Sequence, residues 1–247
     1  MERLLLALDT TTRGGSVALM REGRLLDAQP GDPTRTHGAR LPGELIGILA
    51  RHGLTLADVD VYAVAVGPGS FTGLRIGIAT IQGLAYASGR PVVPVSALEA
   101  TARAAVQVAP AAAVVGVWMD AQRREVFSAL WTVTRAGAAP GLDPLEAPAV
   151  GPPAAVLARW RERLAGRPLV LAGDGATAYR ALATEDGEGW VTIVDRLPPL
   201  AGVMAAMAAE RAAAGETVGP GAIQPLYIRR PDAELAREKQ RRAGDED

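Results

Sequence analysis

Apolar runs that are each long enough for one strand alternate with polar turns and helix-length stretches along residues 1–109. The runs at 4–8, 16–20, 25–29, 61–66 and 91–95 predict strands, and the stretches at 41–52, 74–87 and 97–108 predict helices. Turn residues separate the first three strands, so we expect these strands to pair antiparallel. Ser96 and Glu99 form a capping box, which marks the start of the third helix.

The second half of the chain repeats this order with fewer and shorter pieces. Strands are predicted at 111–119, 125–133, 168–172 and 190–194, and helices at 154–164, 176–182 and 200–214. A stretch rich in alanine, glycine and proline, 136–153, predicts a linker or long loop with one edge strand near 146–150. No strict sequence repeat accompanies the repeated pattern, so the duplication is one of element order.

Three antiparallel strands followed by β-α-β crossovers are the plan of a ribonuclease-H-like half domain, the fold of actin-like ATPases. The repeated order predicts a duplicated α/β fold of this kind, two lobes of mixed sheet with flanking helices. We expect an N-terminal lobe at 1–109 and a smaller lobe at 110–199, with 200–230 returning to pack on the first lobe. The charged residues 231–247 predict a solvated tail.

Composition narrows the class of protein further. The 247 residues contain no run near the roughly 20 apolar positions of a membrane span, and the first nine residues predict a strand rather than a signal peptide. The chain has no cysteine, which excludes disulfides and thiolate catalysis and fits a cytoplasmic address.

Charge and histidine content argue against two further classes of site. The net charge of -1 gives no overall field that would attract RNA, so a nucleic-acid role would depend on a local patch or on a partner. The two histidines, His37 in an expected loop and His52 at an expected helix end, are not spaced as metal ligands, and we expect no metal site.

The predicted hairpin after the first strand is a candidate phosphate site. Hydroxyls of Thr11 and Thr12 and the turn at Gly14 suit phosphate oxygens, and Asp9 suits a hydrated magnesium ion. The match to the ATPase pattern is partial, because Thr11 stands where that pattern has glycine. A structural turn with capping hydroxyls is the alternative reading.

A glycine-rich loop, 67–73, leads from the fourth strand into the helix at 74–87. A helix N-terminus can hold an anion, yet the loop lacks the lysine of a P-loop, so a tight structural turn is at least as consistent with it. Glycines inside the helix each lower its stability by roughly 1 kcal/mol relative to alanine. We therefore expect something to approach the helix closely at these positions.

A second non-polar face on this helix predicts a partner surface, shared with the helix at 41–52. The predicted interface consists of Leu41, Leu45, Ile48, Gly73, Ile76, Gly77, Thr80, Gly83 and Leu84. No catalytic residue is predicted, since Ser70 has no histidine or nucleophile-elbow frame near it, and the charged turn at 120–125 is typical of a solvated hairpin.

Several runs together identify a family. They are Leu6-Ala7-Leu8-Asp9-Thr10-Thr11, Gly67-Pro68-Gly69-Ser70-Phe71-Thr72-Gly73-Leu74-Arg75-Ile76-Gly77, Pro94-Val95-Ser96-Ala97-Leu98-Glu99, Asp120-Ala121, Glu125-Val126-Phe127 and Pro225-Leu226-Tyr227-Ile228-Arg229. With these the chain resembles the TsaB family, also called YeaZ, over nearly its whole length. It departs from the family's usual Asp-Ala-Arg in having Gln122 after Asp120-Ala121.

The resemblance implies a non-catalytic subunit in the synthesis of threonylcarbamoyladenosine beside the anticodon of tRNA. In that family the paralogue TsaD, which carries a metal-binding H-x-x-x-H, performs the transfer, and TsaE supplies an ATPase. The resemblance implies docking on TsaD through a helical bundle, a homodimer when TsaD is absent, and contact with tRNA only through the complex. It implies no tightly bound cofactor on the chain alone, with ATP or ADP and magnesium entering in the complex.

Two rivals remain open from the residues. The first is a stand-alone ATP-binding enzyme of the actin-like class, with Asp9, Thr11 and Thr12 holding magnesium nucleotide. The second is a glycoprotease-type peptidase, against which the missing metal ligands and missing triad count. The interface reading predicts that Gly77→Arg removes docking on TsaD and leaves the fold intact.

Overall fold

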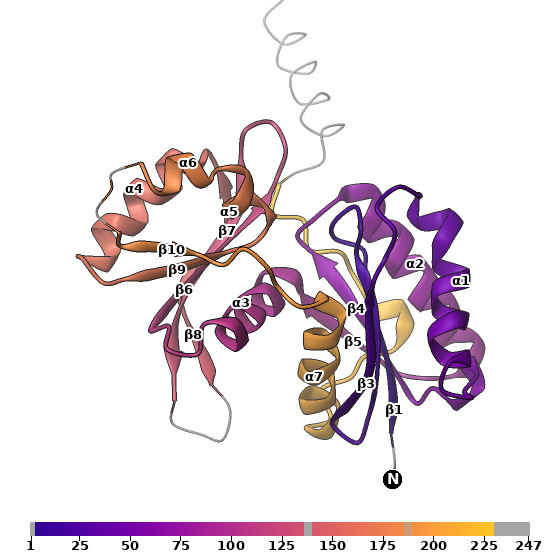
Figure 1. Cartoon of the computed structure of the whole chain (residues 1–247). Helices are drawn as coiled ribbons and strands as arrows, with labels where there is room; N and C mark the ends of the chain where they lie inside the picture. The colour runs from indigo at the N-terminus through magenta and orange to yellow at the C-terminus, as the bar shows by residue number, and fades with distance from the viewer. Residues whose placement is uncertain (1–2, 136–139, 186, 188, 230–247) are drawn as a thin grey trace, which may run out of the picture.

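The computed structural model describes residues 3–135, 140–185, 187 and 189–229, which form two lobes side by side (Figure 1). Among these residues no helix is both long and apolar enough to cross a bilayer. Each lobe is built on a five-stranded mixed sheet, and both sheets follow one topology.

The first sheet has the strand order β3-β2-β1-β4-β5. Its strands are β1 (Leu4–Asp9), β2 (Ser16–Arg21), β3 (Arg24–Pro30), β4 (Val61–Gly67) and β5 (Val92–Ser96). The first three pair antiparallel, and β4 and β5 are added in parallel. Ala7 on the central strand lies opposite Ala18 on one side and Ala63 on the other, so small residues occupy the middle of the sheet.

Helices cover both faces of the first sheet. On one face, α1 (His37–Ala50) and α2 (Phe71–Ser88) pack on the side chains of Leu4, Leu6 and Leu8. On the other face, α7 (Leu200–Ala213) packs on Leu5 and Ala7. The alternation along β1 follows from the two-residue period of a strand, with both faces apolar because both are covered.

The second sheet has the order β10-β9-β6-β7-β8, which read from β8 repeats that of the first sheet. Its strands are β6 (Val114–Asp120), β7 (Val126–Thr134), β8 (Gly141–Gly151), β9 (Leu169–Ala172) and β10 (Val191–Ile193). In both sheets the first three strands along the chain are antiparallel and the last two parallel. The prediction of a duplicated ribonuclease-H-like fold is confirmed.

Two details of the second lobe correct the prediction. The loop expected at 136–153 contains an eleven-residue strand, β8, rather than a short one near 146–150. The helix expected at 176–182 is two short pieces, α5 (Asp174–Ala178) and α6 (Arg180–Ala183), interrupted at Tyr179, whose ψ of 28° is not helical. The outer face of this sheet is covered by these two helices and α4 (Pro153–Leu164).

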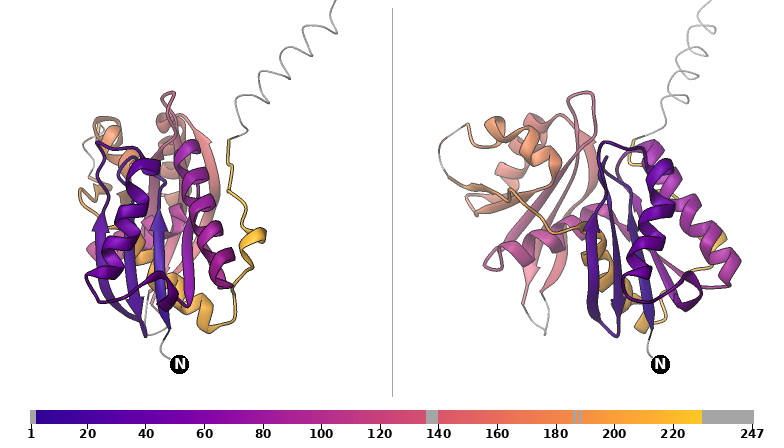
Figure 2. Two further views of the ribbon diagram at one scale, coloured as in Figure 1. Left: turned by 90° about the vertical axis from the view of Figure 1, so that its right-hand side faces the viewer. Right: turned by 45° about the vertical axis from the view of Figure 1, so that its right-hand side comes forward.

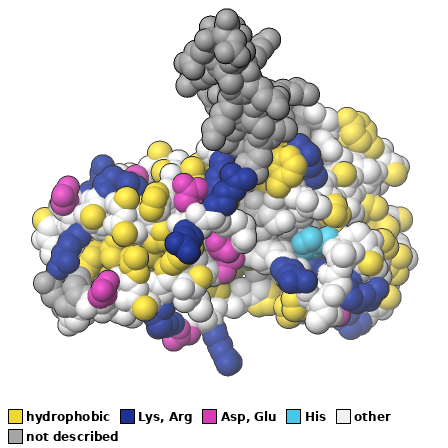
Figure 3. Space-filling view, turned by 90° about the horizontal axis from the view of Figure 1, so that it is seen from above, with side chains coloured by type: hydrophobic (Ala, Val, Ile, Leu, Met, Phe, Trp, Pro, Cys, Tyr) yellow, Lys and Arg dark blue, Asp and Glu magenta, His cyan; other side chains and the backbone are white. Residues whose placement is uncertain are grey.

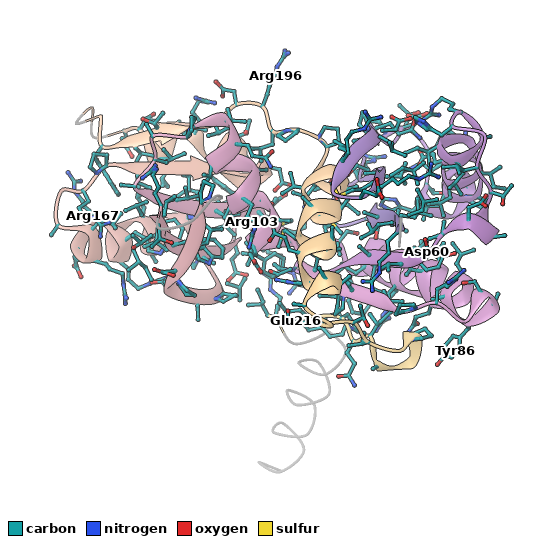
Figure 4. All side chains as sticks on the ribbon, turned by 90° about the horizontal axis from the view of Figure 1, so that it is seen from below. Asp60, Tyr86, Arg103, Arg167, Arg196 and Glu216 are labelled. Atoms are coloured by element: carbon teal, nitrogen blue, oxygen red, sulfur yellow. The ribbon has the colours of Figure 1, made fainter. Side chains whose placement is uncertain are left out.

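Helices α3 (Ala97–Val108) and α7 lie between the two sheets and join the lobes (Figure 1). Ion pairs link the two helices: Arg103 pairs with Glu210 at 3.1 Å, and Arg211 pairs with Glu99 at 2.8 Å. Arg103 is seen at this junction in Figure 4. The predicted cap of α3 is present, since Ser96 Oγ accepts a hydrogen bond from the Glu99 N–H at 3.4 Å.

Two short 3-10 helices complete the described chain. The first, η1 (Leu56–Asp58), precedes β4, and the second, η2 (Pro220–Ala222), follows α7. After η2 an extended segment runs alongside α2 toward the top of the molecule (Figure 2). The amide of Gln82 on α2 donates to the Pro220 carbonyl of η2 at 3.0 Å and to the Ile223 carbonyl at 3.5 Å, so η2 and the start of this segment are attached to the helix.

Candidate functional site

A cleft of about 1050 Å³ opens where the two lobes meet. The first lobe lines it with the hairpin turn after β1 and the loop after β4, and the second lobe with the turn after β6 and the start of α5. Arginine and acidic side chains both face the upper surface around the junction of the lobes (Figure 3). Loops at the carboxyl ends of sheet strands are the usual place for ligands in α/β folds.

The Asp9 side chain stabilises the hairpin turn that follows β1. The Asp9 carboxylate is only 3% exposed, and its Oδ1 accepts hydrogen bonds from the Thr11 N–H at 2.9 Å and the Thr11 hydroxyl at 2.6 Å. Burial raises the pKa of Asp9. Thr11 and Thr12 line the cleft, whereas the Asp9 carboxylate is committed to the turn below them.

A buried arginine supports the other end of this turn. Arg40 is 2% exposed and donates to the Gly14 carbonyl, to Glu44 at 2.5 Å, and lies 2.7 Å from His37 Nδ1. His37 is the first residue of α1 and is buried, so its expected place in a loop is wrong. Burial and the adjacent Arg40 lower the pKa of His37, which favours the neutral imidazole.

The loop after β4 seats directly on that hairpin. The Ser70 N–H donates to the Thr11 carbonyl at 2.8 Å, and Ser70 Oγ caps α2 by accepting from the Gly73 N–H at 3.2 Å. A Cβ on Gly69 would lie 2.6 Å from Thr11 Cβ. The Gly73 N–H at the start of α2 is therefore already bonded, and the loop is packed tightly against the hairpin.

The interior glycines of α2 face the same hairpin. A Cβ on Gly73 would collide with the Thr10 carbonyl, and one on Gly77 with the Thr10 hydroxyl. The close approach predicted for these two positions is real, but it comes from Thr10 of the same chain. Gly83 is different, because no atom lies within 4 Å of its missing Cβ.

The predicted partner interface divides into three groups. Five of its residues are buried inside the first lobe: Leu41, Leu45, Ile48, Gly73 and Gly77. Ile76, Thr80 and Leu84 are half-buried, and Gly83 is exposed. The buried five cannot touch a protein docked on the outside of this lobe, and their inclusion is corrected on that ground. These apolar helix positions pack on the sheet and the β1 hairpin, not on the outer surface.

The outward side of the same two helices carries residues that the prediction missed. Ile46 on α1 is 59% exposed and Tyr86 on α2 is 64% exposed, and Tyr86 projects from the lobe in Figure 4. Arg75 is the only charged residue in the eighteen residues of α2. Ile46 directly follows the buried Leu45, and Tyr86 directly follows the buried Ala85. Because successive side chains of a helix point in different directions, sorting the residues of each helix by face would have found both positions.

The second lobe contributes a polar turn to the cleft. Asp120 accepts hydrogen bonds from the backbone N–H of Gln122 at 2.8 Å and from its side-chain amide at 2.7 Å. Gln122, Arg123 and Arg124 all have positive φ, near 60°. Asp174 Oδ1 accepts from the Asp120 N–H at 3.0 Å. Partial desolvation in the cleft, together with the charge of the Asp120 carboxylate, raises the pKa of Asp174. The residue that departs from the family pattern, Gln122, thus stabilises its own turn.

No group of three or more carboxylate or imidazole side chains arranged for a metal ion occurs among the described residues. The hydroxyl and arginine side chains around the cleft suit an anion better than a cation. The cleft does not carry a purely positive charge, however, because Asp120 and Asp174 also line it.

Two lobes of repeated sheet order with a cleft between them define a duplicated ribonuclease-H-like protein of the actin-like class. The family model described as "TsaD: tRNA N6-adenosine threonylcarbamoyltransferase" matches residues 28–183. The tRNA threonylcarbamoyladenosine biosynthesis protein TsaB of Escherichia coli is 34% identical over 229 residues, covering 91% of this chain and 94% of that protein. This chain therefore belongs to the TsaB family, also called YeaZ, and is related to TsaD.

Two further similarities agree with this. The protein called tRNA threonylcarbamoyladenosine biosynthesis protein TsaB in Haemophilus influenzae is 44% identical over 123 residues, which is 50% of this chain and 51% of that protein. A solved structure described as YeaZ from Pseudomonas aeruginosa has a TM-score of 0.74 and 32% identity, covering 91% of this chain and 99% of that chain. The family resemblance found in the sequence runs is confirmed.

Proposed function

We propose that this chain is the non-catalytic partner of TsaD in the synthesis of threonylcarbamoyladenosine in tRNA. In this proposal it binds and activates TsaD, forms a complex with TsaE, and meets tRNA only through that complex. The surface that docks is the outward side of α1 and α2, here called the docking face, which consists of Gly43, Ile46, Gly47, Ala79, Gly83 and Tyr86. A second copy of the chain takes the place of TsaD when TsaD is absent.

The observation that carries this proposal is the composition of the docking face. A helix on the surface of a monomer normally turns charged residues outward. Helix α2 instead exposes only one charged residue, Arg75, and also turns out Ala79, Gly83 and Tyr86, while α1 exposes Ile46. Open glycines let a partner helix approach closely, and the large apolar side chains supply area to bury. Such a face suits a helical bundle formed between two chains.

Family membership and histidine content support a role without its own metal centre. The related TsaB proteins are named for threonylcarbamoyladenosine biosynthesis. The two histidines are His37, which is buried against Arg40, and His52, which lies 3.3 Å from Asp27. Neither belongs to an H-x-x-x-H pair, the arrangement expected of the subunit that performs the transfer.

The test is co-elution with TsaD on size-exclusion chromatography, using Gly83→Arg as the variant. Position 83 is exposed and has no atom within 4 Å of its missing Cβ, so an arginine there leaves the fold intact. Gly77→Arg is unsuitable, because its Cβ would collide with Thr10. The matched control is Ala158→Arg, an exposed small residue on α4 of the other lobe.

We expect Gly83→Arg to abolish co-elution, while Ala158→Arg co-elutes like the unmodified chain. Circular dichroism should show equal helix content and melting for all three. Co-elution that survives both Gly83→Arg and Ile46→Arg, in folded variants, would refute the docking face. Loss of co-elution in the control as well would mean that added charge, not its place, is responsible.

A second candidate function is nucleotide binding by this chain, and the cleft favours it. The cleft has a volume of about 1050 Å³, which exceeds what a small ligand needs, and the hydroxyls of Thr11, Thr12 and Ser70 line it. The commitment of Asp9 to Thr11 weakens it, because that carboxylate is not presented to a magnesium ion. ATP or ADP with magnesium then belongs to the assembled complex rather than to the chain alone.

A further inference from the structure

The last described segment, residues 223–229, runs from the first lobe toward the second (Figures 1 and 2). It is extended and is not a strand of either sheet. Leu226, Tyr227, Ile228 and Arg229 all line the cleft. This segment, here called the strap, is therefore the edge of the cleft as well as a connection across it.

Its first half is attached to the first lobe. The Leu226 N–H donates to the Val66 carbonyl of β4 at 2.7 Å. The Tyr227 hydroxyl accepts a hydrogen bond from Arg75 Nε at 3.2 Å, and the centroid of the Tyr227 ring lies 5.5 Å from that of the Phe71 ring. Arg75 and Phe71 are both on α2. Arg75 also lies over the Phe71 ring at 3.7 Å. Backbone pairing and a layered aromatic contact fix this end to α2 and β4.

Its second half is attached to the second lobe. Arg229 donates to the Ala121 carbonyl at 2.7 Å and forms an ion pair with Glu125, so that it joins both sides of the turn between β6 and β7. Its guanidinium lies 5.9 Å from the Phe127 ring. Ile228 packs against the core between α3 and the second sheet. One arginine therefore provides the polar anchor on this lobe.

The two anchors differ in kind. The first-lobe anchor combines a backbone hydrogen bond with the Tyr227–Phe71 contact, whose residues are 38% and 43% exposed, and Ile223 at its start is 4% exposed. The second-lobe anchor depends on an arginine whose acidic partner, Glu125, is 32% exposed on its side chain. Ion pairs that face water contribute little to stability, typically about 0 to 1 kcal/mol. Breaking the Arg229–Glu125 ion pair therefore costs little stability, whereas removing Arg229 also removes the Ala121 hydrogen bond and leaves only the Ile228 contact on this lobe.

We propose that the strap is a clamp that fixes the opening between the lobes, and that Arg229 is its release point. In this proposal the lobes rotate about the junction formed by α3 and α7, and the strap restrains that rotation at the edge of the cleft. Since the first anchor is on α2, a protein on the docking face would be linked to the cleft through Arg75 and Tyr227. That last link depends on the proposed function, whereas the clamp itself does not.

The test measures the distance between the lobes in the isolated full-length chain, without TsaD. The chain has no cysteine, so Ala50→Cys on α1 and Ala158→Cys on α4 introduce the only two sites for spin labels. Both positions are exposed, and neither belongs to the strap. Pulsed electron resonance then gives the distribution of distances between the lobes. The release variants are Arg229→Ala and Glu125→Gln, and Gln224→Ala, an exposed strap residue, is the control.

We expect the distribution to become at least twofold broader in both release variants and to stay unchanged in the control. Equal widths in Arg229→Ala, Glu125→Gln and the control would overturn the clamp. Circular dichroism melting identifies a variant that fails to fold. If Arg229→Ala does so, the near-isosteric Glu125→Gln decides the outcome on its own. Loss of TsaD binding in any of these variants would bear on the docking face and not on this result.

Discussion

The backbone carbonyl of Thr10 occupies the place where a Cβ on Gly73 would lie. Gly73 is in the first turn of α2 and Thr10 is in the hairpin after β1, so this contact joins the helix to the candidate phosphate turn. A backbone oxygen cannot rotate away as a side chain can. We expect Gly73→Ala to lower the free energy of unfolding by about 1 to 3 kcal/mol, the usual effect of overpacking.

Gly83 is the matched control for this prediction, since it lies in the same helix and faces open space. Gly83→Ala should raise the free energy of unfolding by about 0.5 to 1 kcal/mol, because alanine restricts the unfolded chain and favours helix. Urea unfolding followed by circular dichroism measures both. A Gly73→Ala protein as stable as Gly83→Ala would show that the hairpin gives way at little cost.

Arg40 connects α1 to the same hairpin and offers a separate prediction. Replacing it by methionine removes the hydrogen bonds to Gly14, His37 and Glu44, all from a side chain that is 1% exposed. Groups left buried without partners destabilise strongly, so we expect Arg40→Met to lower the free energy of unfolding by about 2 to 4 kcal/mol. Urea midpoints with unchanged slopes would measure this.

Arg51→Met is the control for Arg40→Met. Like Arg40, Arg51 pairs with a carboxylate, that of Asp27 at 2.8 Å, but the Arg51 side chain is 47% exposed. Water screens such a pair, so the loss should be below about 1 kcal/mol. Similar losses in the two variants would show that burial of the Arg40 network adds nothing to its contribution.

Burial of Asp9 predicts a pH dependence of stability. Because burial raises its pKa in the folded state, folded protein holds the proton more tightly than unfolded protein does. Its contribution is therefore complete below the unfolded pKa, near pH 4, and is lost as the pH rises through the folded pKa. Asp9→Asn keeps an oxygen for Thr11 and does not titrate.

The measurable quantity is the difference in unfolding free energy between Asp9→Asn and the unmodified chain. It should shift in favour of the unmodified chain when the pH is lowered from 7 to 4. Asp27→Asn, at a half-buried carboxylate whose pKa the Arg51 and His52 contacts lower, should shift in the opposite sense. A difference for Asp9→Asn that is constant over this range would contradict the raised pKa.

The order of elements was predictable because strand and helix periods are local. The departures arise where a neighbour overrides local pattern. Pro144 and Pro148 indicate a loop, yet β8 pairs only with β7 and is an edge strand, where proline is tolerated. The break at Tyr179 divides a run of helix-favouring residues that pattern alone joins into one helix.

The candidate site was less accessible to sequence reasoning, because its geometry depends on contacts between distant segments. Gly73 and Gly77 were correctly identified as places of close approach, but nothing local to them indicates that Thr10 makes the contact. His37 begins α1 and is buried against Arg40, and no apolar pattern in the sequence marks Arg40 as buried. A glycine pattern can show that something is near, and only the fold shows what it is.

The cleft allows a direct test between the partner role and the rival ATP-binding enzyme. Binding of magnesium ATP by the rival would use Asp9, Thr11 and Thr12, yet Asp9 is buried and bonded to Thr11. We expect calorimetry of the isolated chain with ATP and magnesium to show an affinity weaker than about 10 µM, corresponding to less than roughly 7 kcal/mol of binding free energy. A tighter affinity that Asp9→Ala removes, while Asp27→Ala keeps it, would favour the enzyme.

A tighter affinity that survives Asp9→Ala would instead place nucleotide in the cleft without the predicted magnesium ligand. Either result would require that Thr11 release the Asp9 carboxylate or that the lobes provide other contacts.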